Sequence, residues 1–185
     1  MGDLRSAPVP PLRADDHVRG EAGAPLLVLY ADFTCPRCVL AAHRLRAAPV
    51  RVAFRHFALR ARHPRALALA HVSEAAARQG AFWAMHDALY ADPGRIDDPH
   101  LWARCDALGL DVDRFEADRR DPDVAERVAR DVRDALRAGA TATPTAYAED
   151  ARMAATMGEF GLRDARHMGL PTDGRARKEG PQHEQ

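Results

Sequence analysis

The sequence predicts a one-domain α/β protein in which strands and a helix alternate and a long helical block follows. Two apolar runs of strand length, 25–33 and 50–59, flank a helix-forming segment. Their succession indicates a βαβ unit with a right-handed crossover. After Gly139, β-branched and aromatic residues return and predict a further strand around Pro144 to Ala148. A chain of 185 residues has the length of a single domain.

The first predicted strand, PLLVLYADF, is apolar almost throughout, as expected for a strand covered on both faces. A helix should follow from about Pro36 to Ala47, because proline suits the first helical position. The second strand, VRVAFRHFAL, places alternate residues on the same face of the sheet.

The helical block spans about residues 64–138, and several of its segments begin at Asp or Asp-Pro and continue amphipathically. Asp121 or Asp123 is a candidate N-cap for the last of these helices. We expect residues 1–16 to form a disordered, proline-rich lead-in, 17–160 the folded domain, and 161–185 a flexible tail.

The composition, 46% hydrophobic and 29% charged, is typical of a soluble globular protein. No run approaches 18 apolar residues, so we expect no membrane span. The first 25 residues carry prolines and acids where a signal peptide needs an apolar stretch. These features predict a cytoplasmic protein.

The formal net charge is zero, but its sign is unevenly distributed. Residues 33–73 contain no acid, and all eight of their charged side chains are arginines. This stretch is either a solvated face in an arginine-rich sequence or a functional basic surface. No basic motif interleaved with aromatic residues accompanies it, so we do not expect a nucleic-acid partner.

Two of the three cysteines, Cys35 and Cys38, lie three positions apart at the predicted start of a helix. Unpaired backbone N–H groups and the helix dipole favour a thiolate at Cys35. Cys38 lies one turn further in, where it can attack a mixed disulfide at Cys35. Arg37 adds a cation between the two thiols. The spacing therefore favours a redox pair.

Half of a zinc site and two inert buried thiols are the alternatives. A zinc site needs two further ligands at suitable spacing. Cys105 has no partner cysteine, and His43 belongs to no matching histidine pair. Cys105 itself fits a buried apolar-like position.

Four stretches, HVRGEAGAPLLVLYADFTCPRC, VAFRHFAL, GAFWAMHDALY and GATATPT, resemble the DsbA-like thioredoxin-fold thiol–disulfide oxidoreductases in order and separation. The resemblance covers about residues 17–147. It implies a thioredoxin-like fold whose sheet is interrupted by the helical insertion.

The resemblance also implies roles for individual residues. Cys35 would be the attacking and Cys38 the resolving cysteine, in a Cys-Pro-Arg-Cys motif that includes Pro36 and Arg37. Pro144 matches the family's cis-proline, which faces this motif. The backbone of Thr143, the preceding residue, would then pair with an extended substrate segment by β-augmentation.

The sequence departs from the family pattern at three places. Leu29 stands where relatives commonly carry a buried acid that relays protons to the inner thiol. Ala142 replaces a usual glycine and would be strained if that position needed a positive φ. No Asn-Gly hairpin follows the strand at 144–148, so the C-terminal edge strand could be missing.

The leading functional prediction is dithiol–disulfide exchange with protein or low-molecular-weight substrates, without a metal or organic cofactor. The first alternative is a weakly active or inactive thioredoxin-fold binding or regulatory module whose basic stretch recruits an acidic partner. A glutathione-dependent, kappa-like transferase is the second alternative, against which Cys38 argues. The sequence does not indicate an oligomeric state.

Overall fold

The computed structural model describes residues 9–148 and 163–164, which form a five-stranded sheet and six helices. In chain order the first elements are β1 (His17–Arg19), β2 (Leu26–Ala31), α1 (Pro36–Arg46) and β3 (Arg51–His56). Then follow the helices α2 (Ala66–Ala77), α3 (Phe82–Ala91), α4 (Asp98–Ala107), α5 (Val112–Asp118) and α6 (Pro122–Arg137). The strands β4 (Thr145–Ala148) and β5 (Arg163–Asp164) complete the sheet.

The sheet has the order β1-β3-β2-β4-β5. β2 pairs in parallel with β3 and antiparallel with β4, so it is the central strand. β1 is antiparallel to β3, and β5 is parallel to β4. This arrangement confirms the predicted thioredoxin-like α/β fold with a helical insertion between β3 and β4.

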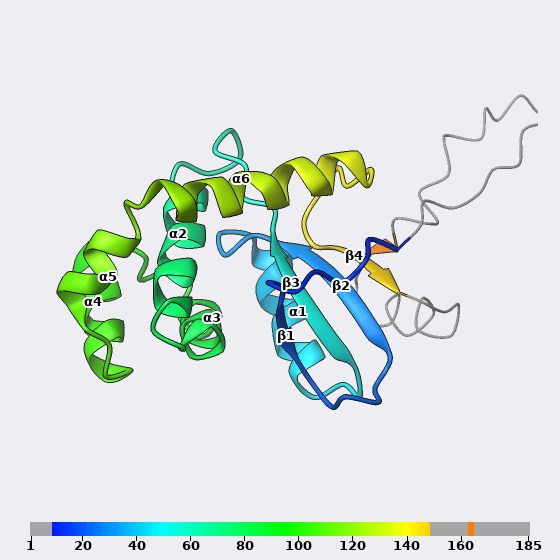
Figure 1. Cartoon of the computed structure of the whole chain (residues 1–185), viewed down its shortest axis with the longest axis horizontal. Coiled ribbons are helices and arrows are strands. Elements are labelled where there is room, and N and C mark those ends of the chain that lie inside the picture. Colours follow the sequence, from blue (N-terminus) through cyan, green and yellow to red (C-terminus); the bar gives the residue numbers. More distant parts are fainter. Residues whose placement is uncertain (1–8, 149–162, 165–185) are drawn as a thin grey trace, which may run out of the picture.

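Alternation along the strands divides the apolar side chains between two cores. On one face, Leu27, Leu29 and Phe54 pack with residues of α1, α2 and α3. On the other face, Val28 and Tyr147 pack with Ala135 of α6. Figure 1 shows α2 to α5 clustered beside the sheet and α6 running from that cluster across the sheet.

Local sequence explains where the main helices begin. Pro36 occupies the first turn of α1, where its missing N–H removes no helical hydrogen bond. Of the two predicted candidates, Asp121 is the N-cap of α6, and its carboxylate accepts a hydrogen bond from the Asp123 backbone N–H at 2.8 Å.

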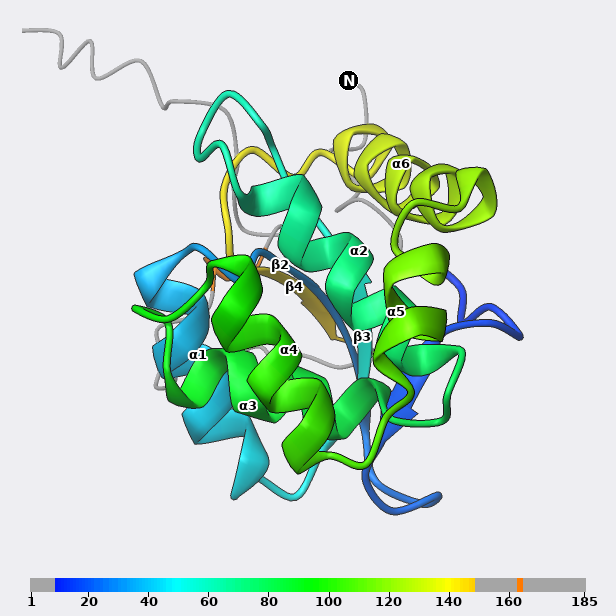
Figure 2. The ribbon, with the colours of Figure 1, turned by 90° about the vertical axis from the view of Figure 1, so that its left-hand side faces the viewer.

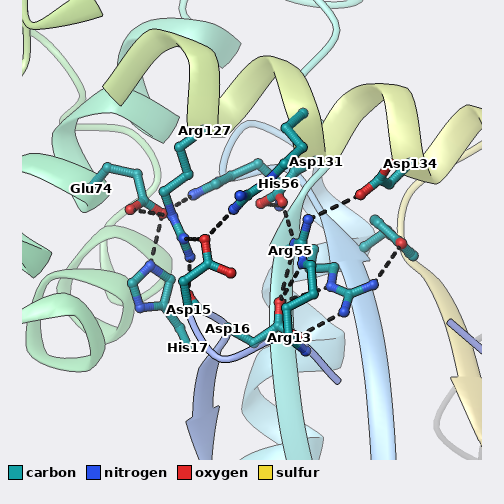
Figure 3. A network of polar contacts seen from close by, with 12 residues as sticks. Arg13, Asp15, Asp16, His17, Arg55, His56, Glu74, Arg127, Asp131 and Asp134 are labelled. Carbon is teal, nitrogen blue, oxygen red and sulfur yellow. Dashed lines mark hydrogen bonds and ion pairs between the residues drawn. The ribbon is translucent and has the colours of Figure 1, made fainter. Parts of the chain in front are cut away.

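The structure differs from the expected lead-in at residues 9–16, which contact the folded domain. The Asp16 side chain is fully buried and forms an ion pair with Arg55, at 2.7 Å between Oδ2 and Nη2. Arg13 pairs with both Asp16 and Asp131 (Figure 3). These oppositely charged side chains form ion pairs at buried positions. The proline-rich composition of the segment does not predict such pairing.

The structure also supplies an edge strand, β5, that the sequence does not predict. Arg163 lies opposite Thr145 and Asp164 opposite Ala146. Residues 163–164 therefore depart from the expected flexible tail. The predictions for residues 1–8, 149–162 and 165–185 lie outside the described residues.

Candidate active site

The two thiols of the motif occupy different environments at the start of α1. Cys35 is the N-cap residue and is partly exposed, whereas Cys38 is 1% exposed and belongs to the core. Both are free thiols. The backbone of Asp32 donates a hydrogen bond to the Cys38 Sγ at 3.5 Å. An accessible thiol thus lies one helical turn from an enclosed one.

Hydrogen bonds at the helix N-terminus lower the pKa of Cys35 to about 5. The largest contribution is a hydrogen bond with the Cys38 thiol, which outweighs the opposing effect of burial. Thr143 and the backbone N–H groups of Cys38 and Arg37 also stabilise the thiolate. Cys35 is therefore a thiolate at neutral pH.

Burial raises the pKa of Cys38 above that of a free thiol, and the neighbouring Cys35 adds to this effect. Burial also raises the pKa of Cys105, to about 11. Of the three cysteines, only Cys35 combines exposure with a lowered pKa.

The loop before β4 faces this thiol. The Thr143–Pro144 peptide bond is cis, as the family resemblance implies. The Cys35 Sγ lies 3.5 Å from the Thr143 carbonyl oxygen, to which Cys35 donates when it is protonated. Figure 2 shows this loop beside the start of α1, so residues far apart in sequence meet here.

A groove of about 510 Å³ opens at this meeting point. Its lining includes Cys35, Pro36, Arg37 and Thr143, so four predicted site residues border one space. The other two, Cys38 and Pro144, are buried and do not line the groove.

Three further groove residues, Asp32, Arg62 and His63, were not singled out from the sequence as site residues. The Asp32 carboxylate accepts hydrogen bonds from the Thr34 backbone N–H and hydroxyl, both at 2.7 Å. This Asx turn fixes the loop just before Cys35. An Asp two residues before Thr, ahead of a helix-starting proline, is the signal that could have identified it.

The three departures from the family pattern have different structural outcomes. Leu29 is a core residue, 3% exposed, so it contributes no carboxylate near Cys38. No described residue other than glycine has a positive φ, so the expected strain at Ala142 is absent. The third departure concerned the edge strand, which β5 provides.

Aromatic side chains close the site from the core side. Phe33 packs against Phe54 at 5.5 Å and Tyr90 at 4.9 Å between ring centroids. The Tyr90 hydroxyl is buried and has no hydrogen-bond partner among the described residues. Burial raises its pKa, and the charges of Cys38 and Asp32 add to this effect.

Residues 26–165 match the DSBA-like thioredoxin domain family. The chain belongs to this family. A solved thioredoxin-like oxidoreductase from Silicibacter pomeroyi superimposes with a TM-score of 0.67, at 24% identity, over 75% of this chain and 83% of that one. Pseudomonas aeruginosa DsbA2 gives a TM-score of 0.57 at 28% identity, over 73% of this chain and 80% of that one.

The curated proteins that the chain matches are much longer than the chain itself. The chain is 41% identical over 151 residues to Na(+)/H(+) antiporter NhaA 3 of Salinispora tropica, and 40% identical over 159 residues to the NhaA antiporter of Herminiimonas arsenicoxydans. These matches cover 78% and 82% of this chain, but only 23% and 25% of the antiporters. The DSBA-like chain thus spans about a quarter of the length of these relatives.

The described part of the chain contains no helix with the length and hydropathy of a membrane span. Within residues 9–148 and 163–164, no cluster of three or more His, Cys, Asp or Glu side chains could hold a metal ion.

Proposed function

We propose that the chain is a thiol–disulfide oxidoreductase in which Cys35 attacks and Cys38 resolves. The observation that carries this proposal is the contrast between the two thiols, one an accessible thiolate and the other buried one turn away. Dithiol–disulfide exchange needs this division of roles. Membership of the DSBA-like family supports it.

The exchange proceeds in two balanced steps. The Cys35 thiolate attacks one sulfur of a substrate disulfide, forming a mixed disulfide and releasing the other substrate sulfur as a thiolate. The Cys38 thiolate then attacks Cys35 Sγ, forming the Cys35–Cys38 disulfide and releasing the second substrate thiolate. Two electrons pass from the dithiol to the substrate, and the reverse reaction oxidises a substrate dithiol.

The surroundings of Cys35 affect the direction of this exchange. Stabilising its thiolate favours the reduced protein, which makes the disulfide form a stronger oxidant. We also propose that the protein is located in the cytoplasm. There, glutathione and thioredoxin systems would keep Cys35 and Cys38 in the dithiol form. The net reaction would then be reduction of the substrate. Acid trapping of the thiols in cells would measure their resting redox state.

Alkylation of the reduced protein by iodoacetamide across a pH series tests the proposal. We expect one fast-reacting thiol with an apparent pKa of about 5, and its loss in Cys35→Ser. Cys38 and Cys105 should remain slow, because both are buried and have raised pKa values.

Reduction of bis(2-hydroxyethyl) disulfide, a neutral substrate, provides the catalytic readout. Cys35→Ser should abolish it. An apparent pKa at or above about 8.5, the value of a free thiol, together with no turnover, would support a thioredoxin-fold binding module instead.

A further inference from the structure

Two arginines line the groove beside Cys35, and neither is paired with a carboxylate in the described part of the chain. Arg37 and Arg62 both line it and both are exposed. Arg62 donates one hydrogen bond, to the Thr141 carbonyl oxygen at 3.3 Å. Among the described residues, neither arginine forms an ion pair.

Three other arginines of the stretch 33–73 form ion pairs, namely Arg46, Arg55 and Arg65. Arg65, three residues after Arg62, pairs with Asp98 at 2.8 Å. Arg55 is paired with Asp16 in the interior. Arg51 and Arg60 also form no ion pair with any described residue, so what distinguishes Arg37 and Arg62 is that they line the groove.

The one carboxylate that lines the groove is not available to contact a substrate. Asp32 is 4% exposed, and one of its oxygens already accepts both hydrogen bonds from Thr34. His63 adds a ring whose Nδ1 accepts the Arg65 backbone N–H at 3.1 Å. An incoming substrate thus meets two guanidinium groups rather than a carboxylate.

We propose that the preferred substrates are protein disulfides flanked by acidic residues in an extended segment. This inference rests on the proposed function of Cys35. The groove volume, about 510 Å³, lies within the range of ligand sites and provides room beyond the disulfide itself. Arg37 and Arg62 would bind carboxylates on the segment, while Thr143 lies at the edge that an extended backbone would follow.

Matched peptide disulfides test the charge preference. Three peptides share one sequence except for the residues flanking the disulfide cysteine, which are Glu, Gln or Lys. Second-order rates with reduced protein are measured by stopped flow at low and high ionic strength. At low ionic strength the Glu peptide should react about tenfold faster than the Gln peptide and the Lys peptide more slowly, because opposite charges steer encounter. High ionic strength should remove these differences.

Variants locate the effect in the groove. Arg62→Gln should lower the ratio of the Glu-peptide to the Gln-peptide rate, a readout in which any general change in Cys35 reactivity cancels. Arg62→Lys should restore part of the ratio. Arg60→Gln removes an exposed arginine two residues away that does not line the groove, and should leave the ratio unchanged.

Each outcome supports or overturns a separate statement. Equal rates for the three peptides, or a faster Lys peptide, would overturn the acidic preference while leaving oxidoreductase activity intact. Glutathione disulfide reacting faster than the Glu peptide would overturn the assignment to protein segments and indicate a small anionic thiol. Absence of reaction with every peptide and with bis(2-hydroxyethyl) disulfide would overturn the proposed function, and this inference with it.

Discussion

The difference in protonation between the two active-site sulfurs predicts which half of the exchange is slow. In the proposed exchange, Cys38 must lose its proton to attack Cys35, yet burial raises its pKa, and Leu29 contributes no carboxylate to accept that proton. The thiolate fraction of Cys38 therefore limits resolution at neutral pH.

We expect the rate of resolution to rise about tenfold per pH unit from neutral to mildly alkaline pH, as the thiolate fraction does below the pKa. A preformed mixed disulfide at Cys35, with release of the second thiol followed by absorbance, would give this profile. Cys38→Ser should hold the mixed disulfide at every pH. A rate that is flat across this range would show that another group accepts the proton.

The unpaired hydroxyl of Tyr90 gives a second prediction at this scale. A buried polar group without a partner costs about 1–3 kcal/mol, so Tyr90→Phe should leave stability unchanged or raise it by about 1 kcal/mol. Urea unfolding of the reduced proteins measures the difference. A loss of stability would reveal a hydrogen-bond partner for the hydroxyl, for which the Cys38 thiol is the candidate.

At the scale of elements, residues 13–17 join the sheet to the helical insertion. Asp16 contacts Arg55 of β3, and Arg13 reaches Asp131 and Asp134 of α6 (Figure 3). His17 of β1 lies 2.8 Å from Glu74 of α2, between Nε2 and Oε1. The segment thus connects three elements that are distant in sequence.

Asp16→Ala should destabilise the protein by about 3–5 kcal/mol, because it leaves the buried Arg55 guanidinium without its carboxylate. Asp15→Ala is the matched control. Asp15 pairs with Arg127 and Arg130, but its side chain is 46% exposed, so its loss should cost less than about 1 kcal/mol. Equal losses in the two variants would show that Asp16 does not contribute through burial.

The same elements show how far the sequence could predict the fold. β2, α1, β3 and the cap of α6 follow from local patterns, namely apolar runs, a helix-starting proline and an Asp before a helix. β1 has three residues of intermediate burial, too few to establish an alternation. The burial of Asp16 depends on Arg55, 39 residues away, so only the tertiary structure reveals it.

The site was predictable to a similar extent. The thiols and the flanking proline and arginine are adjacent in sequence, whereas Thr143 and Pro144 were placed through family resemblance. Arg62 and His63 were not predicted as groove residues, because they reach it through a loop after β3 that carries no periodic pattern.

For the molecule as a whole, the lowered pKa of Cys35 makes stability depend on pH. The folded-state pKa of Cys35, about 5, lies below the value of about 8.5 for a free thiol. Folding therefore favours its thiolate, and the reduced protein gains stability from this group as the pH rises from about 5 toward 8.5. The gain is complete above the free-thiol value and is lost as the pH falls through 5.

Urea unfolding of the reduced protein and of Cys35→Ser at several pH values isolates this effect. The difference in unfolding free energy between the two should grow across this window and disappear below its lower limit. Titrating groups that do not interact with Cys35 are common to both proteins and cancel. A difference that does not vary with pH would contradict the lowered pKa of Cys35.

The central position of β2 predicts when activity is lost during denaturation. Because β2 is hydrogen-bonded to β3 on one side and β4 on the other, its backbone amides are shielded from local opening and should exchange with solvent only when the whole domain unfolds. Cys35 follows this strand after a three-residue loop that the Asp32 carboxylate fixes. The reactive sulfur is therefore attached to the most persistent part of the sheet, so catalysis and the fold should disappear in the same denaturant transition.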